Sequence, residues 1–105
     1  MFIYNTTFHI DNSVEKDAIY FFQTEYIPKA LEGDLFEFPR MCRLLNIPQE
    51  GSSTYCLQFE TDSLENLEKW KISLGDALSK EIALRFKDRV LAFASLMEDL
   101  SLAAE

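Results

Sequence analysis

The sequence has little of the chemistry that enzymes and metal proteins usually concentrate. It holds one histidine and two cysteines among 105 residues. The cysteines, Cys42 and Cys56, lack the Cys-x-x-Cys spacing of redox and zinc motifs. Neither a cysteine nor an acidic residue flanks His9 at the spacing of a metal-ligand motif. We therefore expect no metal site and no cofactor, and the sequence leaves open whether the protein is an enzyme.

Basic residues and long apolar runs are also scarce. Ten Lys and Arg stand against 18 Asp and Glu, which gives a net charge of -8. This charge would repel a nucleic-acid backbone and the anionic surface of a membrane. No stretch reaches the roughly 18 apolar residues of a membrane span, and residues 1–5 lack the basic start of a secretory signal. We expect a cytoplasmic protein that binds neither nucleic acid nor membrane.

Apolar surface, in contrast, is plentiful. Hydrophobic residues make up 48% of the chain and aromatic residues 13%. A chain of 105 residues can build one domain with a real core but not two. We expect residues 1–100 to form this domain and residues 101–105 to form a frayed C-terminal tail. Two helices and one sheet face cannot hide all the apolar surface, so we expect something else to cover the remainder.

The order of the periodic patterns predicts the architecture. Residues 2–10, 35–47, 54–61 and 90–97 read as strands. Residues 13–32 and the apolar stripe from Leu64 to Phe86 have the period of helices, and Asp62 or Ser63 can cap the second one. This β-α-β-β-α-β order, with right-handed crossovers, predicts a ferredoxin-like α+β sandwich. Its four-stranded antiparallel sheet would carry both helices on one face.

Local signals predict how the helices begin and end. Asn12 and Glu15 form a variant of the capping box, so the first helix should begin at residue 13. Pro28 removes a backbone donor and should kink the last turns, which end at Gly33. Gly75 should divide the second helix, with Asp76 available to cap its second half.

The sequence also predicts which way side chains face in the second strand and how the last strand is covered. In the second strand, Phe36 and Phe38 should share a face with Arg40. The last strand is apolar on both sides, which is typical of a strand with both faces covered.

The sheet face away from the helices predicts self-association. Apolar side chains appear on that face in several strands, and monomers seldom leave such a patch in water. We expect a homodimer in which two sheets face each other as a dimeric α+β barrel. If the hairpin turn centres on residues 49 and 50, Cys42 and Cys56 lie opposite each other within range of a disulfide under oxidation. In a cytoplasmic protein we expect them to be reduced and packed.

Short motifs recur from one end of the chain to the other. They are Ile3-Tyr4-Asn5, Tyr26-Ile27-Pro28-x-x-Leu31, Phe36, Arg40-x-x-Arg43-Leu44-Leu45, Thr54-Tyr55 and Val90-x-Ala92-Phe93. With these motifs the sequence resembles an uncharacterised bacterial family, domain-of-unknown-function family 4286, over nearly its whole length. The chain departs from the family pattern at Tyr26, where the family has His, and in the first helix, where the family tends to carry Trp. The resemblance implies a ferredoxin-like fold related to dimeric α+β barrels and no established activity.

Candidate ligand-binding residues lie on the sheet face away from the helices. Alternation along the first and third strands puts Asn5, His9 and Gln58 there. Arg40 in the second strand could bind a carboxylate ligand, and Arg40 or Arg43 could instead pair with Glu60 across the hairpin. A partly solvated structural histidine, polar groups satisfied by water or by a partner chain, and the ion pair are the ordinary alternatives.

These observations favour a non-enzymatic dimeric module that binds a small apolar molecule or another protein. The alternative is a small dimeric-barrel enzyme, like a monooxygenase or an isomerase, in which His9, Asn5 and Gln58 orient an apolar or aromatic substrate. Only fold analogy supports that alternative. Tyr4, Tyr26 and Tyr55 could each place a hydroxyl at the end of an apolar cavity, but core packing is the simpler interpretation.

Overall fold

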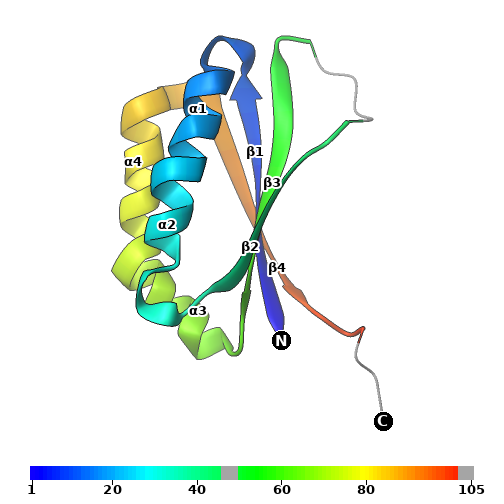
Figure 1. Cartoon of the computed structure of the whole chain (residues 1–105), viewed down its shortest axis with the longest axis vertical. Coiled ribbons are helices and arrows are strands. Elements are labelled where there is room, and N and C mark those ends of the chain that lie inside the picture. The colour runs from blue at the N-terminus through cyan, green and yellow to red at the C-terminus, as the bar shows by residue number, and fades with distance from the viewer. Residues whose placement is uncertain (46–49, 102–105) are drawn as a thin grey trace.

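The computed structural model describes residues 1–45 and 50–101. The strands are β1 (Phe2–Asp11), β2 (Glu37–Arg43), β3 (Ser52–Thr61) and β4 (Val90–Glu98), and the α-helices are α1 (Glu15–Phe21), α2 (Ile27–Ala30), α3 (Leu64–Trp70) and α4 (Asp76–Phe86). A π-helical turn over Phe22–Tyr26 joins α1 to α2, and another over Lys71–Gly75 joins α3 to α4. Each pair therefore forms one continuous helical segment (Figure 1).

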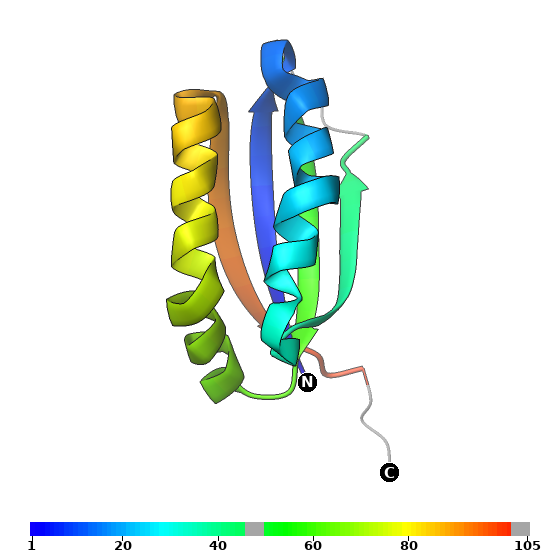
Figure 2. The same cartoon turned by 60° about the vertical axis from the view of Figure 1, so that its left-hand side comes forward.

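The four strands form one antiparallel sheet in the order β2-β3-β1-β4. β1, one of the two central strands, pairs along its length with β3, from Phe2 opposite Thr61 to Asp11 opposite Ser52. Both helical segments cover the same face of this sheet (Figures 1 and 2). The predicted ferredoxin-like sandwich is thus confirmed, and the chain itself leaves the other sheet face uncovered.

Aromatic side chains dominate the core between the sheet and the helices. Phe8 of β1 packs on Phe22 with ring centroids 4.5 Å apart, and Phe36 stacks on Trp70 at 4.3 Å. The predicted inner faces of the helices are confirmed, because most of their apolar residues are buried: Ala18, Phe21, Phe22, Ala30, Leu67, Trp70, Leu78, Ile82 and Phe86. Leu64, which the stripe includes, is instead half exposed at the first turn of α3.

The first helical segment begins differently from the prediction. Asp11, not Asn12, provides the cap, because its Oδ1 accepts a hydrogen bond of 2.8 Å from the Ser13 amide. A 3-10 turn over Asn12–Val14 then precedes α1. Asp11 is the cap because it is the last residue of β1, and its non-helical backbone (φ -59°, ψ 136°) directs its carboxylate at the amides of the first turn, which have no partner within the helix.

Pro28 and Gly33 act near the end of this segment. The Ile27 amide donates to the Phe22 carbonyl, five residues back, directly before Pro28, which has no N–H to donate. The irregularity expected at the proline is therefore a π-helical turn. Gly33 ends the helical region with a φ of 83°, as predicted.

The second helical segment is capped as predicted but is not divided. Ser63 Oγ accepts a 3.1 Å hydrogen bond from the Asn66 amide. At Gly75 the helix continues into α4, and the Asp76 side chain makes no capping bond. Gly75 serves packing instead: a Cβ there would lie 2.5 Å from Cζ3 of Trp70. The glycine therefore lets the indole lie against the helix backbone.

Strand β2 is shorter than predicted and irregular. A bulge between Glu37 and Arg40 shifts its register with β3, and Phe38 within it has a φ of 53°. The strict alternation predicted for residues 35–47 therefore fails, because a bulge inserts an extra residue. Phe36 is 2% exposed in the core, whereas Phe38 is 66% exposed. The expected hairpin turn at residues 49 and 50 and the expected tail at residues 101–105 lie mostly outside the described part of the chain, which omits residues 46–49 and 102–105.

Strand β4 is not covered on either face within one chain. All its residues from Leu91 to Glu98 are exposed, although the sequence predicted cover on both sides. β4 lies at the sheet edge next to α4 (Figure 2), but only its first residue, Val90, is buried, and the small side chains of Ala92 and Ala94 remain exposed beside the helix. Within residues 1–45 and 50–101, no helix has the length and apolarity needed to cross a membrane.

Candidate functional site

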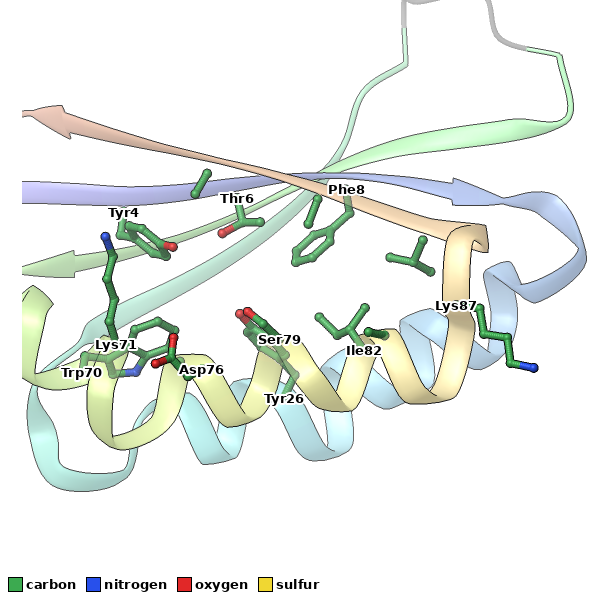
Figure 3. A pocket seen from close by; sticks show the side chains of 15 residues that line it. Tyr4, Thr6, Phe8, Tyr26, Trp70, Lys71, Asp76, Ser79, Ile82 and Lys87 are labelled. Carbon is green, nitrogen blue, oxygen red and sulfur yellow. The ribbon is translucent and has the colours of Figure 1, made fainter.

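A groove of about 480 Å³ lies between α4 and the β1–β4 side of the sheet, on the face that carries the helices. Figure 3 shows this groove from close by, with the sheet on one side and the helices on the other. Its lining residues come from the sheet and from both helical segments: Tyr4, Thr6, Phe8, Tyr26, Trp70, Lys71, Gly75, Asp76, Ser79, Ile82, Ala83, Lys87, Val90, Ala92 and Ala94.

Small side chains on both walls create this space. Ala92 and Ala94 of β4 face the helices, and Ser79 and Ala83 face them from α4. Larger side chains at these positions would fill a gap of this kind, as they do between the helices and β3. The inner walls remain aromatic and buried, with Trp70 2% exposed. The groove is therefore open to solvent along α4 and β4 and closed at its floor.

Hydroxyl groups converge on the groove from both sides. Tyr4 and Thr6 extend from β1, and Tyr26 and Ser79 extend from the helices (Figure 3). Burial raises the pKa of the Tyr26 phenol strongly, and the nearby Tyr4 adds to this shift. Burial also raises the pKa of Tyr4; the Thr6 hydrogen bond opposes this rise, and the Asp76 carboxylate adds to it. Both phenols are therefore neutral near pH 7 and can donate hydrogen bonds.

Three charged side chains line the groove. Lys71 Nζ lies 5.9 Å from the centre of the Tyr4 ring, at the end of the groove where Trp70 lies (Figure 3). The Asp76 carboxylate projects into the same end, while the Lys87 side chain points away from the groove (Figure 3). Polar and apolar groups are thus combined as in sites for small molecules, with a few polar groups on an apolar wall.

The residues predicted from the sequence lie on the opposite face of the sheet. His9 Nδ1 lies 3.0 Å from Thr54 Oγ1, and its ring meets Phe93 edge-on at 5.8 Å. Asn5 Nδ2 donates to Thr7 Oγ1 at 3.3 Å. The side-chain oxygen of Asn5, Oδ1, is buried and accepts no hydrogen bond within the described residues. These groups share one face, as predicted, but they line no common cavity.

Arg40 and Gln58, in contrast, do meet. They are register partners on β2 and β3, and they line a shallow hollow of about 470 Å³ together with Ile3, Phe38, Pro39 and Glu60. Neither Asn5 nor His9 lines this hollow. Of the four predicted residues, Arg40 and Gln58 therefore lie together, whereas Asn5 and His9 lie apart from them.

The ion pair expected across the hairpin is not formed. The described part of the chain has no ion pair between Glu60 and either Arg40 or Arg43, because the bulge places Glu37 opposite Glu60. The Arg43 guanidinium lies instead 5.7 Å from the Tyr55 ring centre. The Tyr55 hydroxyl donates to Glu15, and both side chains line a separate hollow together with Arg43.

Most of the groove is not predicted by the sequence. Tyr4 and Tyr26 are candidates for lining a cavity, but no pattern places them together with Asp76 and Ser79. The available signal was the pair of alanines at positions 92 and 94, which are small residues on the inward face of an otherwise bulky strand. No group of three or more metal-ligating side chains occurs among the residues that the structure describes.

Solved structures with the same fold were found by comparison. An EthD family protein from Bacillus halodurans C-125 has a TM-score of 0.69 at 13% identity, and the match covers 94% of this chain and 99% of that chain. A point mutant of MhuD with two manganese protoporphyrin IX bound per active site has a TM-score of 0.68 at 14% identity, covering 95% of each chain. A dimeric ferredoxin-like protein from an uncultured marine organism has a TM-score of 0.65 at 17% identity, and the match covers 93% of this chain and 97% of that chain.

At these identities the structural similarity shows the fold alone. A comparison with curated protein sequences finds no match. A family model does match, over residues 1–100, and this match covers both helical segments and all four strands. The chain therefore belongs to DUF4286, a family described as a domain of unknown function.

Proposed function

We propose that this protein is a homodimer that binds a small, largely apolar molecule in the groove between α4 and β4. The groove itself carries the proposal: about 480 Å³ of space falls within the range of small-molecule sites. Its walls are aromatic, and its few polar groups come from different elements. We infer that binding rather than acid-base chemistry is its main role, because its two tyrosine phenols are held neutral.

The chemistry of the lining suggests the class of ligand. Tyr4, Tyr26 and Trp70 present ring surfaces that suit a flat apolar molecule. The two phenols donate hydrogen bonds, so the ligand should carry an acceptor oxygen. MhuD shows that this fold accommodates a porphyrin. The described lining residues of this groove include neither His nor Cys, the common axial ligands of haem iron. An organic ring compound fits these groups better than haem does.

The proposed dimer uses the sheet face away from the helices. Leu91 and Phe93 are exposed there in one chain, at 50% and 59%. A patch of this kind commonly marks an interface. Asn5, His9, Arg40 and Gln58 would then lie between the two sheets, where they contact the second copy or a ligand enclosed by both. The cytoplasm is the proposed location, in keeping with two free cysteines.

A second candidate function is a small enzyme acting on an apolar or aromatic substrate. The observation in its favour is that Asp76 and Tyr4 occupy the same end of the groove. A carboxylate can accept a proton from a bound substrate and a phenol can return one, as an isomerisation requires. Turnover of a bound ligand, compared between the native chain and Asp76→Asn, would distinguish this enzyme from a binding protein.

Fluorescence tests the binding proposal directly. Trp70 is the single tryptophan of the chain and lines the groove, so a ligand there should quench its emission. N-phenyl-1-naphthylamine, an uncharged aromatic dye, serves as the probe. Ala83→Leu should fill the groove and weaken dye binding at least about tenfold, a loss of about 1.4 kcal/mol.

Ala77→Leu is the matched control, because Ala77 is exposed on the same helix but does not line the groove. It should bind the dye as the native chain does. Equal binding by all three proteins, or no quenching of Trp70 on saturation, would place the dye elsewhere and refute the groove as the ligand site.

A further inference from the structure

Two free cysteines face each other directly across the β2–β3 pairing. Cys42 and Cys56 are Cα partners in this register, and side chains directly opposite in a sheet project from the same face. That face is the one away from the helices. Cys42 is exposed and Cys56 is half-buried, so one thiol is open to solvent and the other lies beside it.

The hydrogen bonding fixes the spacing of this pair. The Leu44 amide donates to the Thr54 carbonyl at 2.9 Å, and these residues lie two positions from the cysteines along each strand. Hydrogen-bonded and non-hydrogen-bonded pairs alternate in an antiparallel ladder. Cys42 and Cys56 therefore occupy a hydrogen-bonded pair, whose Cα atoms lie about 5.5 Å apart. Disulfides span Cα separations of about 4.4–6.8 Å.

The surroundings leave the two thiols available to each other. Cys56 Sγ has one polar neighbour, Thr7 Oγ1 at 3.8 Å, which is a weak contact that a bridge need not disturb. The bulge of β2 lies between Glu37 and Arg40, so the register at Cys42 is regular. The Cβ atoms of a hydrogen-bonded pair lie near the upper end of about 4.5–5.5 Å, beyond the roughly 3.5–4.5 Å of a relaxed disulfide, so the two strands must approach locally and the bond would be strained and readily reduced.

We propose that Cys42 and Cys56 form a reversible disulfide when the protein meets a peroxide. One thiolate attacks a peroxide oxygen and becomes a sulfenic acid with release of water, and the second thiolate displaces water from that sulfur. In sum, two thiols and hydrogen peroxide give one disulfide and two water molecules. The sulfurs lose the two electrons that reduce the peroxide. Two molecules of a thiol such as glutathione reduce the bond again by exchange and are themselves joined in a disulfide.

The disulfide would add a covalent link to β2, an edge strand with few buried side chains. β2 pairs only with β3 and has no residue that is fully buried. A bridge would fix this edge strand and close residues 42–56 into a loop, which restricts the unfolded chain. The oxidised protein should therefore melt at a higher temperature than the reduced protein.

The test treats the reduced native chain with hydrogen peroxide. Free thiols should fall from two to none per chain, and the mass should drop by two hydrogen atoms. The protein should still migrate as one chain on a non-reducing gel. Its melting temperature should rise and return to the starting value with dithiothreitol. Cys42→Ser and Cys56→Ser are the controls, because each keeps one thiol and should gain oxygen rather than lose hydrogen.

The reaction is run above and below the concentration at which light scattering shows the protein to dissociate. Shielding by a second copy would slow the loss of thiols only at the higher concentration, and the bridge would still form at the lower one. The proposal fails if both thiols persist at both concentrations, if the native chain gains oxygen like the single variants, or if the gel shows two chains joined by the bond.

Discussion

Tyrosine hydroxyls give the groove polarity without giving it charge. Burial raises the pKa of Tyr4 and Tyr26 above the ordinary phenol value of 10.0. In the folded chain these groups keep their protons at a pH at which the unfolded chain loses them. The free energy of unfolding should therefore be unaffected by them below pH 10.0 and should decrease as the pH rises above it.

Tyr26→Phe tests this alkaline dependence. The variant lacks the phenol with the larger shift, so its free energy of unfolding should decrease less steeply above pH 10.0 than that of the native chain. Urea unfolding on either side of that pH measures the slope. Tyr20→Phe, at a residue that is 68% exposed, should leave the slope unchanged. An identical slope in all three proteins would contradict the assignment.

Phe22 is the residue on which the aromatic core depends most visibly. It is fully buried and its ring lies against Phe8 and Tyr26. Phe22→Ala should lower the free energy of unfolding by about 3–5 kcal/mol, a large part of the total for a domain of this size. Thermal melting followed by circular dichroism would show the loss. Tyr20→Ala on the same helical segment should be close to neutral, and equal melting of the two variants would contradict the assigned helix face.

Lys87 ends α4 in a conformation that side chains rarely adopt. Its φ is 53° and its ψ is -130°, a region in which only glycine avoids strain. Lys87→Gly should raise the free energy of unfolding by about 1 kcal/mol, after the extra entropy of glycine in the unfolded chain is subtracted. Urea unfolding gives the value. Asp88→Gly is the control and should destabilise, because Asp88 is not among the described residues with a positive φ.

At the scale of the elements, the pairing of Trp70 with Gly75 shapes both the second helical segment and the groove. A methyl group at position 75 would meet the indole at 2.5 Å, so Gly75→Ala should displace Trp70. The cost should be about 1–3 kcal/mol, and it outweighs the gain of about 1 kcal/mol in helix propensity.

Two measurements check this variant. The melting temperature of Gly75→Ala should fall, and the emission of Trp70 should move to longer wavelength as the ring becomes more exposed. Ala77→Leu adds bulk at an exposed position of α4 and should change neither quantity. A native-like emission spectrum from Gly75→Ala would mean that the helix, rather than the indole, moves aside.

Periodicity predicted the elements well and their irregularities poorly. The apolar stripe of the second helix was read correctly from Leu67 to Phe86, because helical spacing depends on burial of one face. The bulge at Phe38 was missed, since a residue with positive φ leaves no trace in an alternating pattern. The π-helical turns were missed for the same reason: they shift hydrogen bonds by one residue and leave the apolar spacing nearly intact.

The candidate groove was less predictable than the fold. It depends on which helix lies over which strand, and Ala92 and Asp76 come together only through that packing. The location of Asn5, His9 and Gln58 on the sheet face away from the helices was predictable, because the alternation of side chains along a strand assigns each residue to a face. Whether residues on one face share a cavity depends on a second layer above them, and the sequence of one chain does not describe that layer.

For the whole molecule, the uncovered sheet face leads to a prediction of mass. Light scattering at micromolar concentration should give about twice the chain mass of 12.2 kDa, because two apolar faces cover each other. Cys56→Lys should weaken the dimer, since it would bury an unpaired charge on that face. Ile72→Lys, on the outside of the helical layer and 77% exposed, is the control. A monomeric native protein would rule out the dimeric barrel.

The position of β1 between β3 and β4 has a consequence for how the protein is made. Synthesis produces β1 first, yet its two neighbours in the sheet begin only at residues 52 and 90. At a translation rate of about 5–20 residues per second, β1 leaves the ribosome several seconds before its last partner does. During that interval its apolar side chains are open to chaperones and to neighbouring nascent chains. A chain interrupted before β4 would keep one edge of β1 unpaired, so quality control should treat such a fragment as unfolded.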